Sequence, residues 1–299
     1  MNDQLVVAIP NYMGGKFITE TLRSLANNRP HARWWLQDAC SSDTSCEIAF
    51  RYKSDEDIIQ VEPDRGQADA LNKAFAQMGG DIIGFLNSDD LLTPDAAATV
   101  LQAFKKNPEV DLVYGEVEWI DAQGIITGHH AGDISSYEEI LDIYEVWWKE
   151  RQWVQPEVFF RRSLFEKVGL FNTNLELAFD YEYWVRCLAA GARVMRLPKV
   201  LSRFRIHAGQ KSSRAEQASK EIRRVVAHWL RHGSTIRKSL HSRLSVQLSY
   251  DAWRLGERED SNLSLPDALC RHPEWLRLPR VRSRLRTSVA HRLTGGSIR

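Results

Sequence analysis

The sequence has few cysteines and no long apolar run. Four cysteines occur among 299 residues, and no two of them have C-x-x-C spacing. We therefore expect no disulfide framework or zinc site, and Cys40, Cys46, Cys187 and Cys270 should be small core residues in a reducing compartment. No run reaches the roughly 18–20 apolar residues of a membrane span. Since Leu5–Pro10 is too short for a signal peptide, we expect a cytoplasmic protein.

Two common phosphate-binding loops are also missing. The chain contains no G-x-x-x-x-G-K-[ST] loop, which argues against a P-loop nucleotide triphosphatase. No G-x-G-x-x-G follows the first apolar run, which argues against a dinucleotide dehydrogenase. Gly14-Gly15-Lys16 is weakly similar to the triphosphate-binding loop of sugar nucleotidyltransferases. That class of enzyme stays open as an alternative.

The near-neutral charge conceals an uneven distribution. Residues 211–299 contain 19 Lys and Arg against 8 Asp and Glu, whereas residues 1–210 contain 21 and 31. This change in composition predicts that the C-terminal part is a separate, basic segment. We expect a main domain at 1–213 and a basic helical extension at 214–299.

The first half of the main domain, about 1–107, alternates short apolar runs with helical patterns. Such alternation predicts an α/β fold with a Rossmann-like, mostly parallel central sheet and helices on both faces. Thr93 and Pro94 should begin a helix as its N-cap and first residue. We expect strands at 5–10, 34–36, 58–61 and 82–86, and helices at 17–25, 45–52, 68–78 and 93–107.

The second half of the main domain, about 108–213, loses this regular alternation. We expect a mixed or antiparallel arrangement there. The predicted strands are 110–114, 117–120, 158–160, 194–197 and 200–206, and the predicted helices are 135–148, 163–168 and 178–190.

Polar side chains follow each of the first four predicted strands. They are Asn11, Asp38, Asp64-Arg65 and the stretch Asn87-Ser88-Asp89-Asp90. Because the carboxyl ends of parallel strands meet at one edge of a sheet, we expect these groups to surround one crevice. Asp89 and Asp90 suit Mg²⁺ or Mn²⁺, which in turn suggests a nucleotide diphosphate as leaving group. Taken alone, an Asp-Asp pair at this place is more often made of turn and capping residues.

Seven short motifs, in this order, resemble the family 2 inverting glycosyltransferases with the GT-A fold. Each motif is weak alone, and their order and spacing over about residues 5–213 make the resemblance specific. The motifs are Pro10-Asn11-Tyr12, Gln37–Asp43, Gly66–Asn72, Asn87–Asp90, Gln155-Pro156, Phe179–Arg186 and Arg205–His207.

The resemblance implies a nucleotide-diphospho-sugar donor and a divalent cation, Mn²⁺ or Mg²⁺. Asn87-Ser88-Asp89 stands where the family has Asp-x-Asp, so Asp89 is the implied metal ligand, and Asn87 stands at the ribose-facing position. His207 resembles a family histidine near the metal or diphosphate. The remaining implied donor contacts are Pro10, Asn11, Tyr12, Asp38, Arg65, Asn72 and Ser88.

Asp180 falls on the aspartate of the family's Glu-Asp motif, which implies that it is the catalytic base. Its other interpretation is simple helix capping, and Glu182 is a competing base. On the acceptor side, the candidates are Gln155, Glu182 and Trp153; the tryptophan could stack on a sugar ring or fill a core. The implied acceptor is a hydroxyl of a cell-surface polysaccharide or lipid-linked glycan precursor.

The sequence departs from the family's usual residues at several motif positions. Asn87 replaces the first Asp of Asp-x-Asp, and Phe179 replaces the Glu of Glu-Asp. Asn11, Met13 and Ala39 also differ from the common residues. None of these changes removes the metal ligand or the base, but together they leave the identity of the nucleobase open.

The segment 275–293 interleaves arginines with apolar residues. This basic amphipathic pattern is typical of helices on anionic membrane surfaces, so the protein could be peripheral at the inner face of the cell membrane. The alternative is a solvated helix that packs one face on the catalytic domain. A competing function is a non-catalytic scaffold acting through this tail, although no nucleic-acid motif appears and nucleic acid is an improbable partner.

Overall fold

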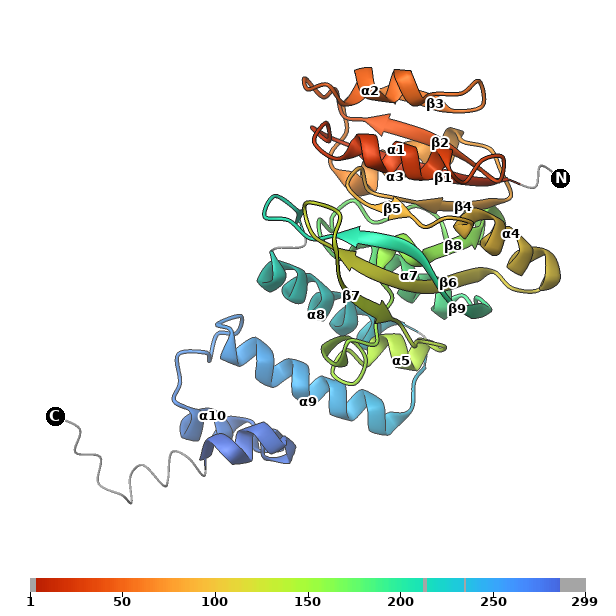
Figure 1. The fold of residues 1–299 in the computed structure, drawn as a ribbon. Coiled ribbons are helices and arrows are strands. Elements are labelled where there is room, and N and C mark those ends of the chain that lie inside the picture. Colours follow the sequence, from red (N-terminus) through yellow and green to blue (C-terminus); the bar gives the residue numbers. More distant parts are fainter. Residues whose placement is uncertain (1–3, 212–213, 234, 286–299) are drawn as a thin grey trace. The chain divides into compact units, whose positions relative to one another are not determined.

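The chain forms two compact units, residues 1–222 and 223–299 (Figure 1). The computed structural model describes residues 4–211, 214–233 and 235–285. The two units divide within helix α8 (Ala215–His232). The first unit therefore includes the start of the segment that the sequence assigns to the C-terminal extension.

The first four strands form the parallel part of one sheet, in the order β3-β2-β1-β4. These strands are β1 (Leu5–Asn11), β2 (Ala32–Asp38), β3 (Ile58–Val61) and β4 (Ile82–Phe85). They are connected by α1 (Ile18–Ala26), α2 (Ser45–Tyr52) and α3 (Gln67–Gln77). This confirms the predicted β-α alternation.

The sheet continues as β8-β6-β9-β5, and β7 pairs with β6. Only β6 and β9 are parallel among the pairs of this half in the described part of the chain, so the predicted mixed arrangement is confirmed. The predicted strand pairs 110–114/117–120 and 194–197/200–206 are each one long strand. The bounds are β5 (Leu91–Leu92), β6 (Leu112–Ile120), β7 (Ile126–Ala131), β8 (Val158–Arg161) and β9 (Val194–Arg205).

Two helix predictions in this unit are wrong in their bounds. The helix expected from Thr93 is α4 (Ala96–Lys106), because β5 pairs with β9 and Thr93 bonds to that strand. The Thr93 hydroxyl donates to the Val200 carbonyl at 2.7 Å, so it caps no helix. The helix expected at 135–148 is the short α5 (Tyr137–Leu141), followed by a separate 3₁₀ turn at Trp147–Lys149. Helices α6 (Arg162–Val168) and α7 (Phe179–Ala189) match their predictions.

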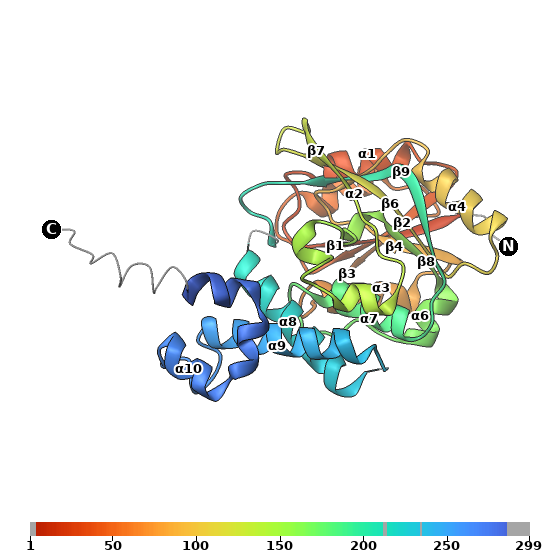
Figure 2. The same ribbon diagram turned by 90° about the horizontal axis from the view of Figure 1, so that it is seen from below.

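Helices cover both faces of the sheet (Figure 2). Leu5, Val7 and Ile9 of β1 lie in one core cluster together with residues of α1, α2 and α4. Successive side chains of a strand alternate between faces, so the opposite face is covered separately. There Phe75 of α3 packs edge-on against Phe160 of β8, with 5.9 Å between ring centroids. These layers confirm the predicted fold class.

The second unit has its own small core. Tyr250, Trp253, Ala268 and Trp275 are buried together with Leu278 and Val281. These residues come from α9 (Lys238–Arg254), α10 (Leu265–Arg271), the 3₁₀ turn Pro273–Arg277 and the segment after it. Trp275, Leu278 and Val281 of the basic segment therefore pack within their own unit, whereas Leu276 is exposed. The remaining residues of the segment, 286–293, lie outside the described part.

Neither a membrane span nor a disulfide is found in the described residues. No helix among them is sufficiently long and apolar to cross a bilayer. All four cysteines are free. Cys187 is buried, but Cys40 and Cys270 are exposed, so the expectation that every cysteine lies in a core is wrong for these two.

Replacing Trp275 by alanine should destabilise the second unit by about 3–5 kcal/mol, because it empties the centre of a small core. Trp275 is fully buried and stacks on His272, with 4.4 Å between ring centroids. Urea unfolding of the full chain measures the loss. Leu276→Ala is the matched control, since Leu276 is 44% exposed and should change stability by less than about 0.5 kcal/mol. Equal effects of both changes would contradict this description of the core.

Candidate active site at the carboxyl edge of the sheet

The carboxyl ends of β1 and β2 are joined by a buried polar network around Asp38. Its carboxylate is fully buried and accepts hydrogen bonds from the Ser41 amide at 2.8 Å and the Ser41 hydroxyl at 2.7 Å. The Asn11 amide donates to Asp38 at 2.5 Å and to Ser45 Oγ at 2.9 Å. Asn11 and Asp38 thus lie together as predicted, but inside the loop. The next residues of the Pro10-Asn11-Tyr12 motif and after it are open to solvent: Tyr12 is 72% exposed and Met13 47%.

Gly14 allows the first loop to lie against the loop after β4. A Cβ atom at Gly14 would lie 2.2 Å from Asn11 Oδ1 and 2.6 Å from Ser88 Oγ, so no side chain fits there. The next amide, that of Gly15, donates to Asp43 Oδ2 at 2.7 Å. Because that amide is already bound, the Gly14-Gly15-Lys16 segment is poorly suited to wrap a triphosphate.

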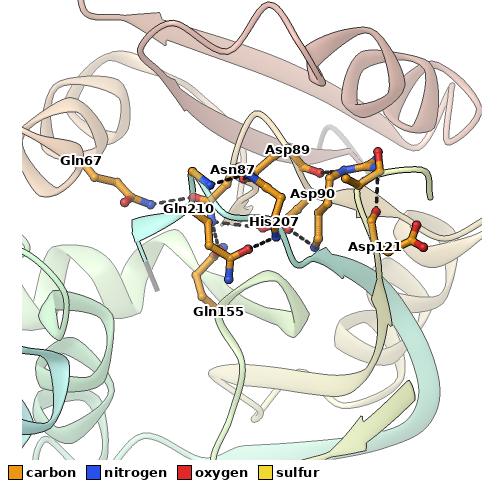
Figure 3. A network of polar contacts seen from close by, with 11 residues as sticks. Gln67, Asn87, Asp89, Asp90, Asp121, Gln155, His207 and Gln210 are labelled. Atoms are coloured by element: carbon orange, nitrogen blue, oxygen red, sulfur yellow. Dashed lines mark hydrogen bonds and ion pairs between the residues drawn. The ribbon is translucent and has the colours of Figure 1, made fainter. Parts of the chain in front are cut away.

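Asn87 is the centre of the loop after β4 (Figure 3). Its Oδ1 accepts from Gln67 Nε2 at 2.6 Å. Its Nδ2 donates to Asp90 Oδ2 and to Gln155 Oε1, at 3.1 Å each. A carboxylate could not donate to these two acceptors, which gives a physical reason for Asn in place of the family's Asp. Gln155, expected on the acceptor side, thus lies against the loop after β4.

Asp90 is a buried connector between this loop and β9. Only 1% of the residue is exposed, and its Oδ1 accepts from the Arg205 amide at 2.9 Å. Burial and the neighbouring Asp89 charge raise the pKa of Asp90 well above its ordinary range. Asp90 is therefore more than the turn or capping residue that was expected, because its side chain joins two distant segments.

Arg205 also lies at this edge, and no role was predicted for it from the sequence. Its guanidinium is fully buried, donating from Nε to the Asp89 carbonyl at 2.9 Å and from Nη1 to the Asp121 carbonyl at 3.2 Å. It also pairs with Glu20 at 2.8 Å and lies over the Phe17 ring. Its position two residues before His207, in the same motif, was the sequence signal that could have identified it. Asp89 and Asp121, whose backbone carbonyls accept two of these bonds, are labelled in Figure 3.

Asp89 and His207 are brought together as predicted. His207 Nε2 lies 2.9 Å from Asp89 Oδ2, and both side chains are partly exposed. The imidazole packs on Phe17, with 4.7 Å between ring centroids, and its Nδ1 accepts from the Gly209 amide at 3.2 Å. The backbone amide of His207 in turn donates to Gln210 Oε1 at 2.7 Å.

This pair fits a divalent cation that shares its remaining positions with substrate and water. A carboxylate oxygen and an imidazole nitrogen are ordinary ligands of Mn²⁺, and Mg²⁺ commonly takes one or two carboxylates plus phosphate oxygens. The described residues form no group of three or more His, Cys, Asp or Glu side chains around a metal position. Ligation by Nε2 would require the imidazole proton on Nδ1, in place of the hydrogen bond from Gly209.

Asp180 lies in the first turn of α7. The ring of the preceding residue, Phe179, lies 6.2 Å from that of Phe85 at the end of β4, so the start of α7 packs beside the carboxyl end of that strand. Asp180 Oδ1 accepts from the Tyr181 amide at 2.7 Å. Burial of the carboxyl raises its pKa to about 6. Asp180 is thus an acid that ionises near neutral pH at the same edge as Asp89.

The carboxylate of Glu182 is already bound by Arg186 of the same helix. Both of its oxygens accept from Arg186 Nε, at 2.9 and 3.1 Å. Arg186 also binds the Val168 and Leu170 carbonyls, at 2.9 and 2.7 Å. Arg186 thus joins α7 to the end of α6 and the loop after it, and it holds the Glu182 carboxylate. Asp180 is therefore the better base candidate.

Three other predicted site residues make their contacts with residues outside this group. Arg65 is exposed and pairs with Asp69 at 3.2 Å. Asn72 is buried, and its amide exchanges two hydrogen bonds with the backbone of Phe171, at 2.8 and 2.9 Å. Trp153 is 4% exposed and packs on Tyr114, with 4.9 Å between ring centroids. Of the two alternatives for Trp153, the structure therefore shows core packing, because no face of the indole is open to a sugar.

Curated relatives match this chain at low identity. An uncharacterized glycosyltransferase of Methanocaldococcus jannaschii, MJ1057, is 24% identical over 64% of this chain and 66% of its own length. The O-antigen biosynthesis protein RfbC of Myxococcus xanthus is 25% identical over 78% of this chain and 18% of its own length. The chain thus spans less than two thirds of these relatives.

Solved structures match the fold more completely. TarS 1-349 of S. aureus in complex with UDP-GlcNAc has a TM-score of 0.63 at 17% identity, over 92% of this chain and 79% of its own. The mannosyltransferase PcManGT from Pyrobaculum calidifontis, in complex with GDP-Man and Mn²⁺, has a TM-score of 0.60 at 18% identity, over 94% and 82%. These similarities show the fold.

The family profile supplies the remaining evidence. The profile described as glycosyl transferase family 2 matches residues 6–169, more than half of the chain. The match contains the network around Asp38 and the loop from Asn87 to Asp90. The chain belongs to glycosyl transferase family 2.

Proposed function

We propose that the protein is a metal-dependent inverting glycosyltransferase that uses a nucleotide-diphospho-sugar donor. The observation that carries this proposal is the placement of three groups at one sheet edge. Asp89 and His207 form a pair suited to a cation, and Asp180 lies at the start of the helix that packs beside β4. Family membership supports the reaction class.

The nucleotide is proposed to lie along the loops after β1 and β2. The Asn11–Asp38–Ser41 network makes those loops rigid, and a rigid loop loses less conformational entropy when it binds a ligand. Tyr12 presents its ring to solvent there and is the proposed contact for the base. Two structural neighbours were solved with UDP-GlcNAc and with GDP-Man, so both uracil and guanine donors are reasonable to test.

The diphosphate is proposed to lie at Asp89 and His207, with Mn²⁺ or Mg²⁺. A bound cation would supply charge stabilisation for the leaving diphosphate. The chain's own part is to hold the two ligands in place. Arg205 fixes the Asp89 backbone, and Phe17 supports the His207 ring. Mn²⁺ in the neighbouring PcManGT structure supports this assignment.

Asp180 is the proposed general base. The acceptor oxygen forms its bond to the anomeric carbon as the bond to the diphosphate breaks, and the electron pair of that bond leaves with the diphosphate. The acceptor proton passes to the Asp180 carboxylate, a transfer worth about 10²–10⁴-fold in rate. A single displacement inverts the anomeric centre, as when a base activates water in inverting glycosidases.

The proposed acceptor is a hydroxyl of a cell-surface polysaccharide or lipid-linked glycan precursor. Relatives are named for O-antigen biosynthesis, for poly-beta-1,6-N-acetyl-D-glucosamine synthesis and for PGL/p-HBAD biosynthesis. These names support a glycan or glycolipid acceptor without identifying one.

Asp180→Asn should lower the rate of sugar transfer by about 10²–10⁴-fold and leave donor affinity within about threefold, because it removes the base without changing the shape of the site. Product formation and calorimetric binding of the donor measure the two effects. Glu182→Gln is the matched control and should retain most activity. Near-normal turnover in Asp180→Asn would show that the base lies elsewhere.

The pH dependence of kcat/KM should show one acid limb. Burial raises the pKa of Asp180 to about 6, above its ordinary value of 3.8, so the base is protonated and inactive below that pH. We expect kcat/KM to fall about tenfold per pH unit below about pH 6 and to be level above it. A profile that stays level down to pH 4.5 would contradict this assignment.

We also propose that the second unit associates with anionic membrane surfaces by charge, at the inner face of the cell membrane. Arg254, Arg280 and Arg284 line a hollow of about 400 Å³ beside Tyr250. The neighbouring Trp275 is fully buried, and Arg254 and Arg280 both pair with Asp251, at 3.6 and 3.2 Å, so the proposed attraction depends on the excess of arginine over this one carboxylate. Each basic residue near an anionic leaflet contributes about 1 kcal/mol.

The double variant Arg254→Gln/Arg284→Gln should therefore co-sediment less with vesicles that contain anionic phospholipid, since it removes two of the charges. The matched control Lys53→Gln/Lys106→Gln removes the same charge from exposed positions on the first unit. Binding of the unaltered chain should weaken between about 0.1 and 0.5 M salt, because salt screens the attraction between the basic residues and the anionic lipid. Equal recovery on neutral vesicles would exclude this association.

A further inference from the structure

Helix α7, which carries Asp180, begins without a capping residue of its own. Its N-cap position is Ala178, which has no side-chain oxygen. The first amides of a helix have no partner within the helix, and a Ser, Thr, Asp or Asn usually supplies one. Ala178 supplies no such oxygen, and the backbone amides of Leu177 and Ala178, which lie just before the helix, bond to an acceptor in a distant part of the chain instead.

That acceptor is Glu221, on α8. A single oxygen, Oε2, accepts from the Leu177 amide at 2.8 Å and from the Ala178 amide at 3.0 Å. Glu221 is 8% exposed. It lies 43 residues beyond Ala178 along the chain. A carboxylate at this end of a helix is also favoured by the positive pole of the helix dipole.

A second contact joins the same two segments. Arg214 Nη2 pairs with Glu176 Oε1 at 2.6 Å, and Gln217 Nε2 donates to Glu176 Oε2 at 3.1 Å. The start of α8 is thus bound to the loop that leads into α7 at two points. These contacts place the beginning of α8 within the first compact unit.

We propose that Glu221 is a positioning residue for sugar transfer: it caps α7 from α8 and sets both the place and the charge environment of Asp180. The proposal rests on Asp180 being the base of the proposed function. Glu221 itself touches no reacting atom. Its negative charge disfavours ionisation of Asp180, adding to the larger effect of burial. Glu182, the other acid of this turn, is held by Arg186.

Glu221→Gln and Glu221→Ala separate the two effects. The glutamine keeps an oxygen that can accept from both amides but removes the charge, whereas the alanine removes both. In Glu221→Gln the acid limb of kcat/KM should move to lower pH, with a plateau within about threefold of the unaltered chain. In Glu221→Ala the plateau of kcat should fall by about 10- to 100-fold, as a small misplacement of a catalytic group can cost this much. Donor affinity should change by less than about threefold in both.

Glu216→Gln is the matched control, because Glu216 is exposed on the same helix. A second readout does not need activity: in protein labelled with ¹³C at aspartate carboxyls, Asp180→Asn identifies the Asp180 signal. The midpoint of that signal should lie near pH 6 in the unaltered chain, move to lower pH in Glu221→Gln and stay in place in Glu216→Gln.

Equal losses of kcat in Glu221→Gln and Glu221→Ala without any shift of the Asp180 midpoint would overturn the proposal and leave Glu221 a purely structural residue. Failure of the proposed function looks different: Asp180→Asn would then remain active, whatever Glu221 does to the carboxyl midpoint.

Discussion

The buried contact between the loop after β4 and the end of β9 is the constraint on which this site depends. Asp90 accepts the Arg205 amide, and the Arg205 guanidinium binds the Asp89 carbonyl. These two bonds cross 115 and 116 residues of chain. A buried guanidinium must have its donors bound, since an unmade hydrogen bond to it would be costly. The position of Asp89 is therefore determined by the end of β9, and His207 lies two residues beyond that end.

The parallel half of the sheet and its edge could be predicted from local pattern. Short apolar runs ending in polar residues identify β1 to β4, and parallel strands place their ends together whatever the side chains do. Asp89 and His207 meet as the motif order implied, and Asp180 begins the predicted helix. The strand predictions succeed because neighbouring residues determine where a strand runs and ends. The proximity of Asp89 and His207 was implied by the family resemblance and not by any local pattern.

The residues that a single pattern could not assign are those with partners far along the chain. Asn72 belongs to a quoted motif, yet its amide is used by the Phe171 backbone. Trp153 is of a residue type that can stack on a sugar ring, but it packs on Tyr114 and is buried. Glu221 lies in a segment whose basic composition suggested a separate extension, although its carboxylate caps α7. In each case a tertiary contact decides between roles that the residue type leaves open.

Asp89 and His207 are proposed to bind a nucleotide diphosphate through a divalent cation. Isothermal titration calorimetry of UDP and GDP into the full chain, with Mn²⁺ or with EDTA, tests this proposal most directly. We predict that one of the two nucleotides binds with Mn²⁺, that EDTA weakens its affinity at least about tenfold, a difference of about 1.4 kcal/mol, and that Asp89→Ala removes this metal dependence. Equal affinity with Mn²⁺ and with EDTA would contradict the claim.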